Sequence, residues 1–176
     1  YTQNVMAMDI TATVSTRGRT TTSLPGVLLA ISQQTVKPKH LVIFDDEKPK
    51  QDLRQISGVN QVLQVLQYKG ISWEVLQTEG QGQTANHQLA LKVVKTPWIW
   101  RLDDDNFPEP DVLEKLCQAV LPDVVGVGSL ILVPGSIAPL GELNSPEITD
   151  SHFKLAIQCG IFEGRRYTSH FHNSFL

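Results

Sequence analysis

Trp98-Ile99-Trp100-Arg101-Leu102-Asp103-Asp104-Asp105-Asn106 joins an apolar run to three consecutive acids, and a turn broken by prolines follows at residues 107–110. Adjacent carboxylates repel one another and resist desolvation unless a cation lies between them. Hard cations such as Mg²⁺ or Mn²⁺ take oxygen ligands and share their coordination with substrate phosphates. A strand that carries these acids at its C-terminal end therefore predicts a site for a metal and a diphosphate. An acidic turn left in solvent is the alternative interpretation.

The spacing of the acids predicts how they divide their roles. In an extended segment alternate side chains share a side, so Asp103 and Asp105 are expected to face one metal ion. Asp104 then faces the other way, where a ribose hydroxyl can use its carboxylate. His170 and His172 also alternate, and His172 is a candidate nitrogen ligand to the metal. A structural role is the alternative for either histidine.

An EF-hand calcium loop is a rival interpretation of the same acids. Its first, third, ninth and twelfth positions would be Asp103, Asp105, Asp111 and Glu114. Pro108 stands where that loop needs glycine, and the pattern before the acids is that of a strand rather than a helix. These two departures disfavour the rival.

Short apolar strands alternate with helical patterns along the chain. We expect strands at residues 9–16, 41–44, 72–76, 96–102 and 124–133, and helices at residues 24–34, 83–94 and 111–120. Residues 51–66 are expected to be helical in part, with Gly58 as a break. Beyond Pro134 the expectations are a loop at 134–146, a short helix at 151–159 and a strand at 165–176. This alternation predicts an α/β fold, a Rossmann-like and mostly parallel sheet with helices on both faces.

In such sheets ligands bind beyond the carboxyl ends of the strands, and polar residues gather there. Ser15, Thr16 and Arg19 follow the first strand, and Asp45 and Asp46 follow the second. Asp45 is a candidate acceptor of hydrogen bonds from a nucleobase imide or a ribose, and Arg19 is a candidate partner of a diphosphate or a base edge. A helix N-cap for Asp45 and a solvated surface loop for Arg19 are the alternatives.

Residues 80–87 form a second, weaker candidate for binding an anion. Gly80 and Gly82 permit close approach of the backbone just before the predicted helix at 83–94, and a helix N-terminus favours negative charge. A plain flexible loop is the alternative interpretation.

Composition bounds the class of protein. The 176 residues are 41% hydrophobic and 19% charged with a net charge of −3, which fits a globular domain and argues against a nucleic-acid partner. No apolar run is long enough for a transmembrane helix, and no signal peptide is readable. The start at Tyr1 predicts a fragment or a processed chain. Cys117 and Cys159 are expected to be buried thiols in a reducing compartment, which places the protein in the cytoplasm or at the cytoplasmic face of a membrane.

Four segments, in order, resemble the inverting glycosyltransferases of family 2, which share the GT-A fold. They are TVSTRGR (13–19), LAISQQTVKPKHLVIFDDE (29–47), NHQLALKVVKTPWIWRLDDDNFPEPDVLEKL (86–116) and SHFHNSFL (169–176). The resemblance implies transfer, with inversion, from a nucleoside-diphosphate sugar such as a UDP- or GDP-sugar. It also implies a Mn²⁺ or Mg²⁺ cofactor and an acceptor hydroxyl on an unknown glycan, lipid or protein.

The resemblance also implies roles for individual residues. Asp45 would contact the base, Ser15 and Arg19 would line the nucleotide pocket, Asp104 would face the ribose, and Asp105 would hold the metal against the diphosphate. Asn86 matches the asparagine of the family's helix and joins the candidate nucleotide-sugar-binding residues, as does Asp103.

The sequence departs from the family pattern in three places. Residues 15–18 replace the usual Pro-Thr-Tyr-Asn, and Ala85 stands where an arginine often precedes the asparagine. The family's catalytic base lies beyond the Ser-Phe-Leu strand, so we expect the base beyond Leu176. The chain, residues 1–176, is accordingly expected to be one donor-binding domain truncated on its acceptor side.

Two rival functions remain open at this point. One is a sugar-phosphate nucleotidyltransferase, although residues 15–20 (STRGRT) are a poor version of its Gly-rich phosphate loop. The other is a catalytically silent module that binds nucleotides or carbohydrates.

Overall fold

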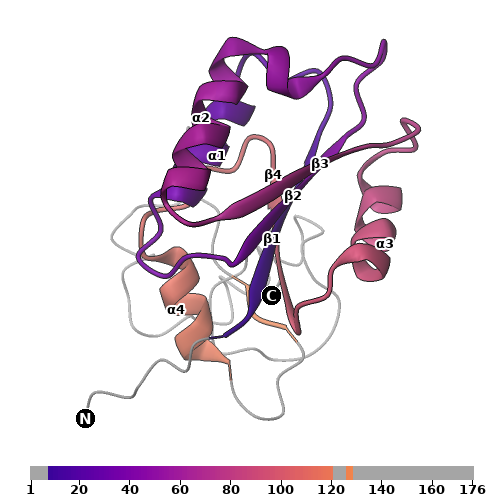
Figure 1. Cartoon of the computed structure of the whole chain (residues 1–176). Helices are drawn as coiled ribbons and strands as arrows, with labels where there is room; N and C mark the ends of the chain where they lie inside the picture. The colour runs from indigo at the N-terminus through magenta and orange to yellow at the C-terminus, as the bar shows by residue number, and fades with distance from the viewer. Residues whose placement is uncertain (1–7, 121–125, 129–176) are drawn as a thin grey trace, which may run out of the picture.

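The computed structural model describes residues 8–120 and 126–128 of the chain. Its centre is a four-stranded sheet in the order β3-β2-β1-β4, in which every neighbouring pair is parallel (Figure 1). The strands are β1 (Ile10–Thr16), β2 (His40–Asp45), β3 (Ser72–Gln77) and β4 (Trp98–Asp103). The predicted α/β class with a parallel sheet is confirmed.

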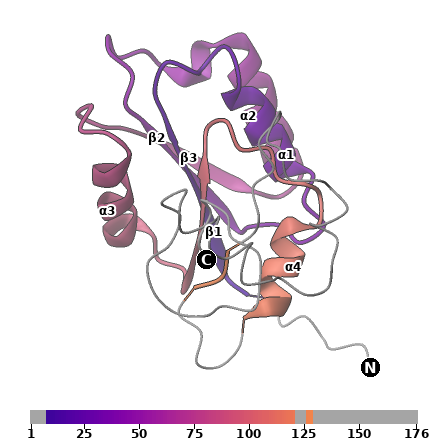
Figure 2. The same cartoon turned by 180° about the vertical axis from the view of Figure 1, so that it is seen from behind.

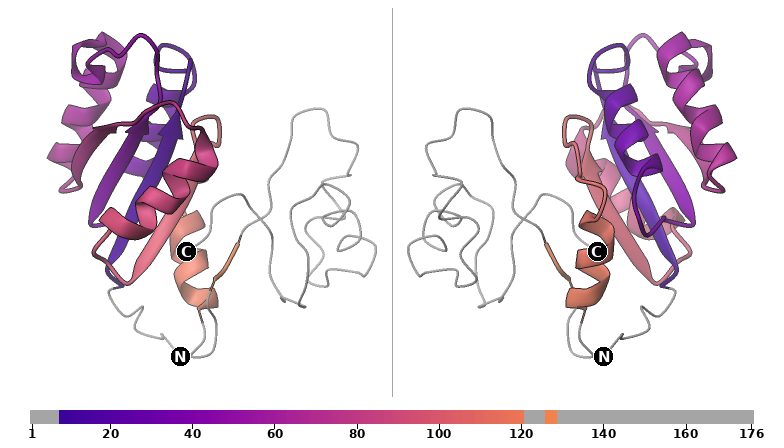
Figure 3. Two further views of the ribbon diagram at one scale, coloured as in Figure 1. Left: turned by 90° about the vertical axis from the view of Figure 1, so that its right-hand side faces the viewer. Right: turned by 90° about the vertical axis from the view of Figure 1, so that its left-hand side faces the viewer.

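Helices cover both faces of this sheet (Figures 1 and 2). Helices α1 (Leu24–Ser32), α2 (Ser57–Tyr68) and α4 (Val112–Ala119) lie on one face, and α3 (Gln83–Val93) lies on the other. Figure 3 shows α3 in front of the strands in its left view and α1 in front of them in its right view.

The core is divided by the sheet into two parts of unequal size. The larger part packs the buried side chains of α1, α2 and α4 on one face of the strands and includes the fully buried Trp100. The smaller part, under α3, is built from Val42, Phe44 and Ala90. Successive residues of a strand point to opposite faces of the sheet. Helices cover both faces of β2, so both sets of its side chains are apolar.

The strand order creates the crevice in which a site is expected. The chain proceeds from β1 to β2 and β3 on one side and then crosses to β4 on the other side of β1. Ligands of open α/β sheets bind at such a switch point, outside the carboxyl ends of the strands. The register pairs Ser15 with Asp103 across one edge of β1 and Thr16 with Asp45 across the other. The candidate residues of three strands are therefore neighbours.

The segment before β3 differs from the expectation. A 3₁₀ turn, η1 (Leu53–Gln55), comes first, and the Asp52 side chain accepts a hydrogen bond from Arg54 N at its start. Helix α2 then begins at Ser57, so Gly58 lies in its first turn and does not break it. A glycine costs little in a first turn, where the helix has no preceding turn to interrupt.

Some predicted elements fall outside the described residues. These are most of the strand at 124–133 and everything expected at 134–176; residues 126–128 are described and form no strand, although Val127 is buried against the core. Cys117 is a buried free thiol on α4, and Cys159 is not described. Within the described ranges, no helix has the length and apolarity needed to span a membrane.

Candidate functional site

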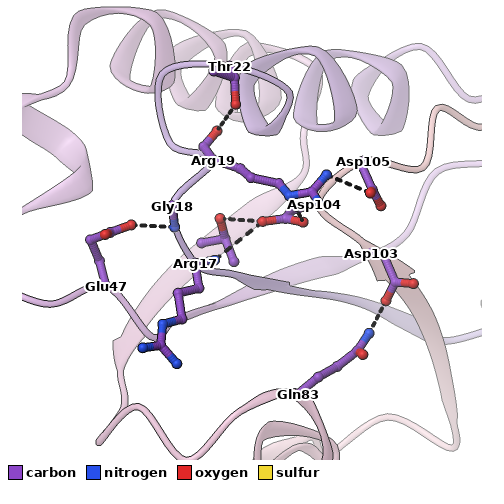
Figure 4. A network of polar contacts seen from close by, with 10 residues as sticks. Arg17, Gly18, Arg19, Thr22, Glu47, Gln83, Asp103, Asp104 and Asp105 are labelled. Carbon is purple, nitrogen blue, oxygen red and sulfur yellow. Dashed lines mark hydrogen bonds and ion pairs between the residues drawn. The ribbon is translucent and has the colours of Figure 1, made fainter.

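Asp104 is the most firmly held of the three acids that follow β4. Its Oδ2 accepts hydrogen bonds from Thr16 Oγ1 at 2.8 Å and from Arg17 N at 3.3 Å (Figure 4). Its Oδ1 lies 3.5 Å from Arg19 Nε. Burial raises the pKa of Asp104, and the bonds from Thr16 and Arg17 and the charge of Arg19 act in the opposite direction. The end of β4 is thereby fastened to the loop that follows β1.

Arg19 is the cation that lies against the acid cluster. Its Nη1 is 2.5 Å from Asp105 Oδ2, and both side chains are 46% exposed. The backbone of Arg19 is fixed to the start of α1, because its carbonyl oxygen accepts from Thr22 N at 3.1 Å and from Leu24 N at 3.2 Å. The repulsion between neighbouring carboxylates, which suggested a divalent ion, is relieved in this structure by a guanidinium.

Asp103 faces the opposite side of the sheet from Asp104. Its Oδ1 accepts a hydrogen bond from Gln83 Nε2, at the first residue of α3 (Figure 4). The expected change of face between residues 103 and 104 is thus present. Asp103 and Asp105 have different partners, Gln83 and Arg19. The strand ends at Asp103 and residues 104–105 form a turn, so the alternation that was expected to point Asp103 and Asp105 toward one ion does not continue through Asp105.

Ser15 and Asn86, both expected in the nucleotide pocket, contact each other. Asn86 Nδ2 donates a 2.7 Å hydrogen bond to Ser15 Oγ, which joins α3 to β1. Asn86 is 2% exposed. The asparagine therefore fixes the end of β1, from which the loop at residues 17–19 continues.

The two acids at the end of β2 have opposite environments, although both are almost fully buried. Asp45 Oδ1 accepts from Glu47 N at 3.0 Å, whereas Asp45 Oδ2 is buried and has no hydrogen-bond partner among the residues that the structure describes. Burial raises the pKa of Asp45. An unsatisfied buried oxygen is costly, so Asp45 Oδ2 is an acceptor whose hydrogen-bonding capacity is unused among the described residues.

Asp46 is instead surrounded by donors. Its carboxylate accepts from Thr78 Oγ1, from Gly80 N at 3.2 Å and from Gly82 N at 2.9 Å. Burial alone would raise the pKa of Asp46, but hydrogen bonds from Thr78, Gly82, Asn86 and Gly80 outweigh it and lower the pKa. The glycine segment that the sequence suggested for an anion holds this carboxylate, and both glycines need positive φ, 70° and 89°, to present their N–H groups.

The sequence predicted no specific contact for several residues that connect the carboxyl ends of the strands. Asp46, Gln83 and Thr16 each connect two strand-end loops, and Gly18 N donates to Glu47 Oε2 at 2.6 Å to connect two more. The two glycines before α3 were a readable signal of a carboxylate partner. The other contacts join segments far apart in sequence, and no local pattern marks them.

Two further predictions concern residues that are not part of this acid cluster: the EF-hand alternative and His172 as a metal ligand. The EF-hand alternative is wrong, because Asp111 Oδ2 pairs with Lys115 Nζ at 2.7 Å and Glu114 Oε2 accepts from Thr35 Oγ1 at 2.7 Å. His172 lies outside the described residues, so its role as a metal ligand stays a prediction.

The acid cluster fits one kind of metal site. Within residues 8–120 and 126–128, no three His, Cys, Asp or Glu side chains are grouped so that they could hold an ion by themselves. Mg²⁺ and related hard ions are commonly held by one or two carboxylates, with phosphate oxygens and water completing the shell. Asp105 is half exposed at the switch point and fits as one such carboxylate, whereas Asp103 is bonded to Gln83 on the α3 side.

Solved structures of the protein TarS and of a mannosyltransferase share this fold. "Crystal structure of S. aureus TarS 1-349" aligns with a TM-score of 0.57 and 20% identity over 81% of this chain and 42% of that one. The same protein in complex with UDP aligns with a TM-score of 0.56 and 18% identity over 78% and 40%. The mannosyltransferase PcManGT from Pyrobaculum calidifontis, in complex with GDP-Man and Mn²⁺, aligns with a TM-score of 0.57 and 20% identity over 71% and 36%.

These likenesses establish the fold, and this chain spans about two fifths of the length of those chains. Comparison with curated proteins gives no match. The sequence profile described as "Glycosyl transferase family 2" matches residues 14–136, which is more than half of the chain and includes the ends of β1, β2 and β4. The chain therefore belongs to glycosyl transferase family 2.

Proposed function

We propose that this chain is the donor-binding domain of a metal-dependent glycosyltransferase that moves a sugar, with inversion, from a nucleoside-diphosphate sugar to an acceptor hydroxyl. The observation that carries the proposal is the acid cluster at the switch point between β1 and β4. There Asp104 is anchored by Thr16 and Arg17, while Asp105 keeps a half-exposed carboxylate. Membership of the family and the UDP and GDP-mannose complexes of its structural neighbours support a nucleotide-sugar donor.

The base of the nucleotide is proposed to bind at the end of β2. Uracil and guanine both present an imide or amide N–H, and Asp45 Oδ2 is a buried acceptor without a partner. A donor placed there would remove the cost of the unsatisfied oxygen. Asp46 is the less suitable acceptor, since the loop after β3 already supplies it with donors.

The diphosphate and ribose are proposed to bind between β1 and β4. Asp105 and Asp103, with His172 as a further candidate, would hold Mn²⁺ or Mg²⁺. Such an ion, when bound, neutralises charge on the departing nucleoside diphosphate. Asp104 is proposed to accept a hydrogen bond from a ribose hydroxyl, and Ser15, which Asn86 holds, is paired with the preceding residue, Asp103, in the register of the sheet.

Inversion requires a base that removes the proton of the acceptor hydroxyl.

Calorimetric titration of UDP and GDP, with and without Mn²⁺, tests the proposal. We expect one of the two to bind with a Kd of roughly 1 μM to 1 mM in a manganese-dependent manner. Asp105→Asn should weaken this binding at least about tenfold, which corresponds to about 1.4 kcal/mol. Glu109→Gln, which neutralises an exposed acid in the following turn, is the matched control and should bind like the wild type.

The outcomes separate the candidate functions. Wild-type affinity in Asp105→Asn would contradict the metal site. Turnover of a nucleoside triphosphate with a sugar phosphate would favour a nucleotidyltransferase. Tight donor binding without hydrolysis or transfer would favour a catalytically silent binding module.

A further inference from the structure

We infer that Arg19 is a built-in counter-cation that competes with the divalent ion for Asp105, and that metal binding releases its guanidinium to the diphosphate. This inference rests on the proposed function, because it takes the acid cluster to be the metal site. It assigns Arg19 two successive partners, an acid of its own chain and then the donor.

The contacts of Arg19 place it where a metal would have to bind. Its Nη1 is 2.5 Å from Asp105 Oδ2 and its Nε is 3.5 Å from Asp104 Oδ1, so one guanidinium spans two neighbouring acids. A metal ion bound to Asp105 Oδ2 would lie within a few ångströms of the Arg19 guanidinium unless the side chain moved. Like charges at that distance repel, so the two cations compete for this carboxylate.

The ion pair between Arg19 and Asp105 can be broken at little cost, whereas Asp104 is held in place by other hydrogen bonds. Ion pairs between half-exposed side chains contribute little to stability, and Arg19 and Asp105 are each 46% exposed. Asp104 is only 12% exposed and keeps Thr16 and Arg17 N as partners when Arg19 leaves. The acid cluster therefore keeps one fixed member while Asp105 changes its partner.

The released guanidinium would remain at the site. The carbonyl oxygen of Arg19 is bonded to the backbone at the start of α1, so only the side chain needs to move. This position, after β1 at the switch point, is where a diphosphate would bind. A guanidinium presents a planar set of donors that matches phosphate oxygens.

Arg17 provides the matched control on the same loop. Its backbone N–H contacts Asp104, whereas its exposed side chain points away from the three acids in Figure 4. Arg17→Gln thus removes the same unit of charge two residues away without removing a contact of the acids. Any difference between Arg17→Gln and Arg19→Gln reports on position rather than net charge.

Two titrations test the inference. The first follows free Mn²⁺ by electron paramagnetic resonance without nucleotide, and Arg19→Gln should bind Mn²⁺ about two- to fivefold more tightly than Arg17→Gln. The second titrates UDP and GDP at saturating Mn²⁺, and Arg19→Gln should bind the preferred nucleotide about tenfold more weakly than Arg17→Gln. Opposite effects on metal and nucleotide are the signature of one cation serving two partners.

Equal or weaker Mn²⁺ binding by Arg19→Gln overturns the competition, provided that wild type and Arg17→Gln bind the ion. Tighter Mn²⁺ binding with unchanged nucleotide affinity overturns the transfer of the guanidinium to the diphosphate. If wild type and both variants bind no Mn²⁺ with or without nucleotide, the proposed function fails, and the role of Arg19 fails with it.

Discussion

Asn86 Nδ2 lies 2.7 Å from Ser15 Oγ and donates a hydrogen bond across 71 residues of sequence. The asparagine is almost fully buried in α3, and its amide also contributes a hydrogen bond to Asp46. One amide therefore supports the ends of both β1 and β2, which border the proposed binding places of the diphosphate and of the base.

Replacement of Asn86 by alanine should destabilise the fold. The change removes a donor from the buried Asp46 carboxylate and another from the partly buried Ser15 hydroxyl, and an unsatisfied buried group costs roughly 1–3 kcal/mol. Urea unfolding should show a decrease of that size in the free energy of unfolding. The control is Asn60→Ala on the exposed side of α2, which should stay within about 0.5 kcal/mol of wild type. An Asn86→Ala protein as stable as the control would contradict a supporting role.

Asp45→Asn and Asp46→Asn should change stability in opposite directions at neutral pH. The pKa of Asp45 is raised, so its contribution is present below the unfolded value of 3.8 and is lost as pH rises through the folded value. The pKa of Asp46 is lowered, so its contribution is present above 3.8 and is lost as pH falls through the folded value. Neutralising Asp45 should therefore stabilise the protein at pH 7, and neutralising Asp46 should destabilise it.

Chemical unfolding of both variants at pH 7 and near pH 3 measures this contrast. The loss in Asp46→Asn should be roughly 1–3 kcal/mol at pH 7, since charged hydrogen bonds are weakened. Both effects should shrink at the acidic pH, where the wild-type carboxyls take up protons. If the two variants behave alike at pH 7, the assigned environments are wrong. The same two variants test the base contact. When nucleotide affinity is expressed per folded protein, Asp45→Asn should weaken binding more than Asp46→Asn does.

His87 should make the protein less stable as pH falls from 6.5 to 4. Burial, and then the charge of Arg101, lower the pKa of His87 from 6.5 to about 4. In this window the unfolded chain binds a proton that the folded chain does not, so stability is full above pH 6.5 and declines below it. The decline is on the order of 2 kcal/mol after allowance for partial exposure. His87→Gln should flatten the pH profile, and the imidazole resonances assigned to His87 in the wild type should titrate near 4; a midpoint near 6.5 for this residue would contradict the prediction.

The strands and helices could be predicted because their residues repeat with the period of the element. The strand that ends at Phe44 was readable from its continuous apolar run, and the buried Val42 and Phe44 show why both of its faces are apolar. The prediction that Gly58 breaks a helix was wrong, because the local pattern of residues does not determine where a helix begins. The start of α2 depends instead on the 3₁₀ turn that Asp52 closes with Arg54.

The candidate site was predictable in its place but not in its contacts. Acids and hydroxyls at strand ends converge because the strands are parallel, and the sequence shows both features. The partner of Asp105 is Arg19, 86 residues earlier, and the sheet register brings the two together. A cluster of acids calls for a cation on electrostatic grounds, and sequence alone does not distinguish a metal ion from a guanidinium.

Gly26 and Phe107 give a final test, because a side chain at one position would displace the other. A Cβ added to Gly26 of α1 would lie 2.6 Å from Phe107 Cε1, which is too close, so the ring in the turn after Asp105 would have to move. In a wild-type background Gly26→Ala should therefore be neutral or destabilising by about 1 kcal/mol, as strain offsets its better helix propensity.

In a Phe107→Ala background the obstacle is absent, and the same Gly26→Ala change should stabilise the protein by at most about 0.5 kcal/mol, since Gly26 lies in the first turn of α1 and glycine costs less there than in a helix interior. A double-mutant cycle by urea unfolding measures this reversal of sign. Mn²⁺ affinity should fall in Gly26→Ala, because the displaced ring belongs to the turn that carries Asp105. Equal effects of Gly26→Ala in the two backgrounds would show that the helix does not set the position of that turn.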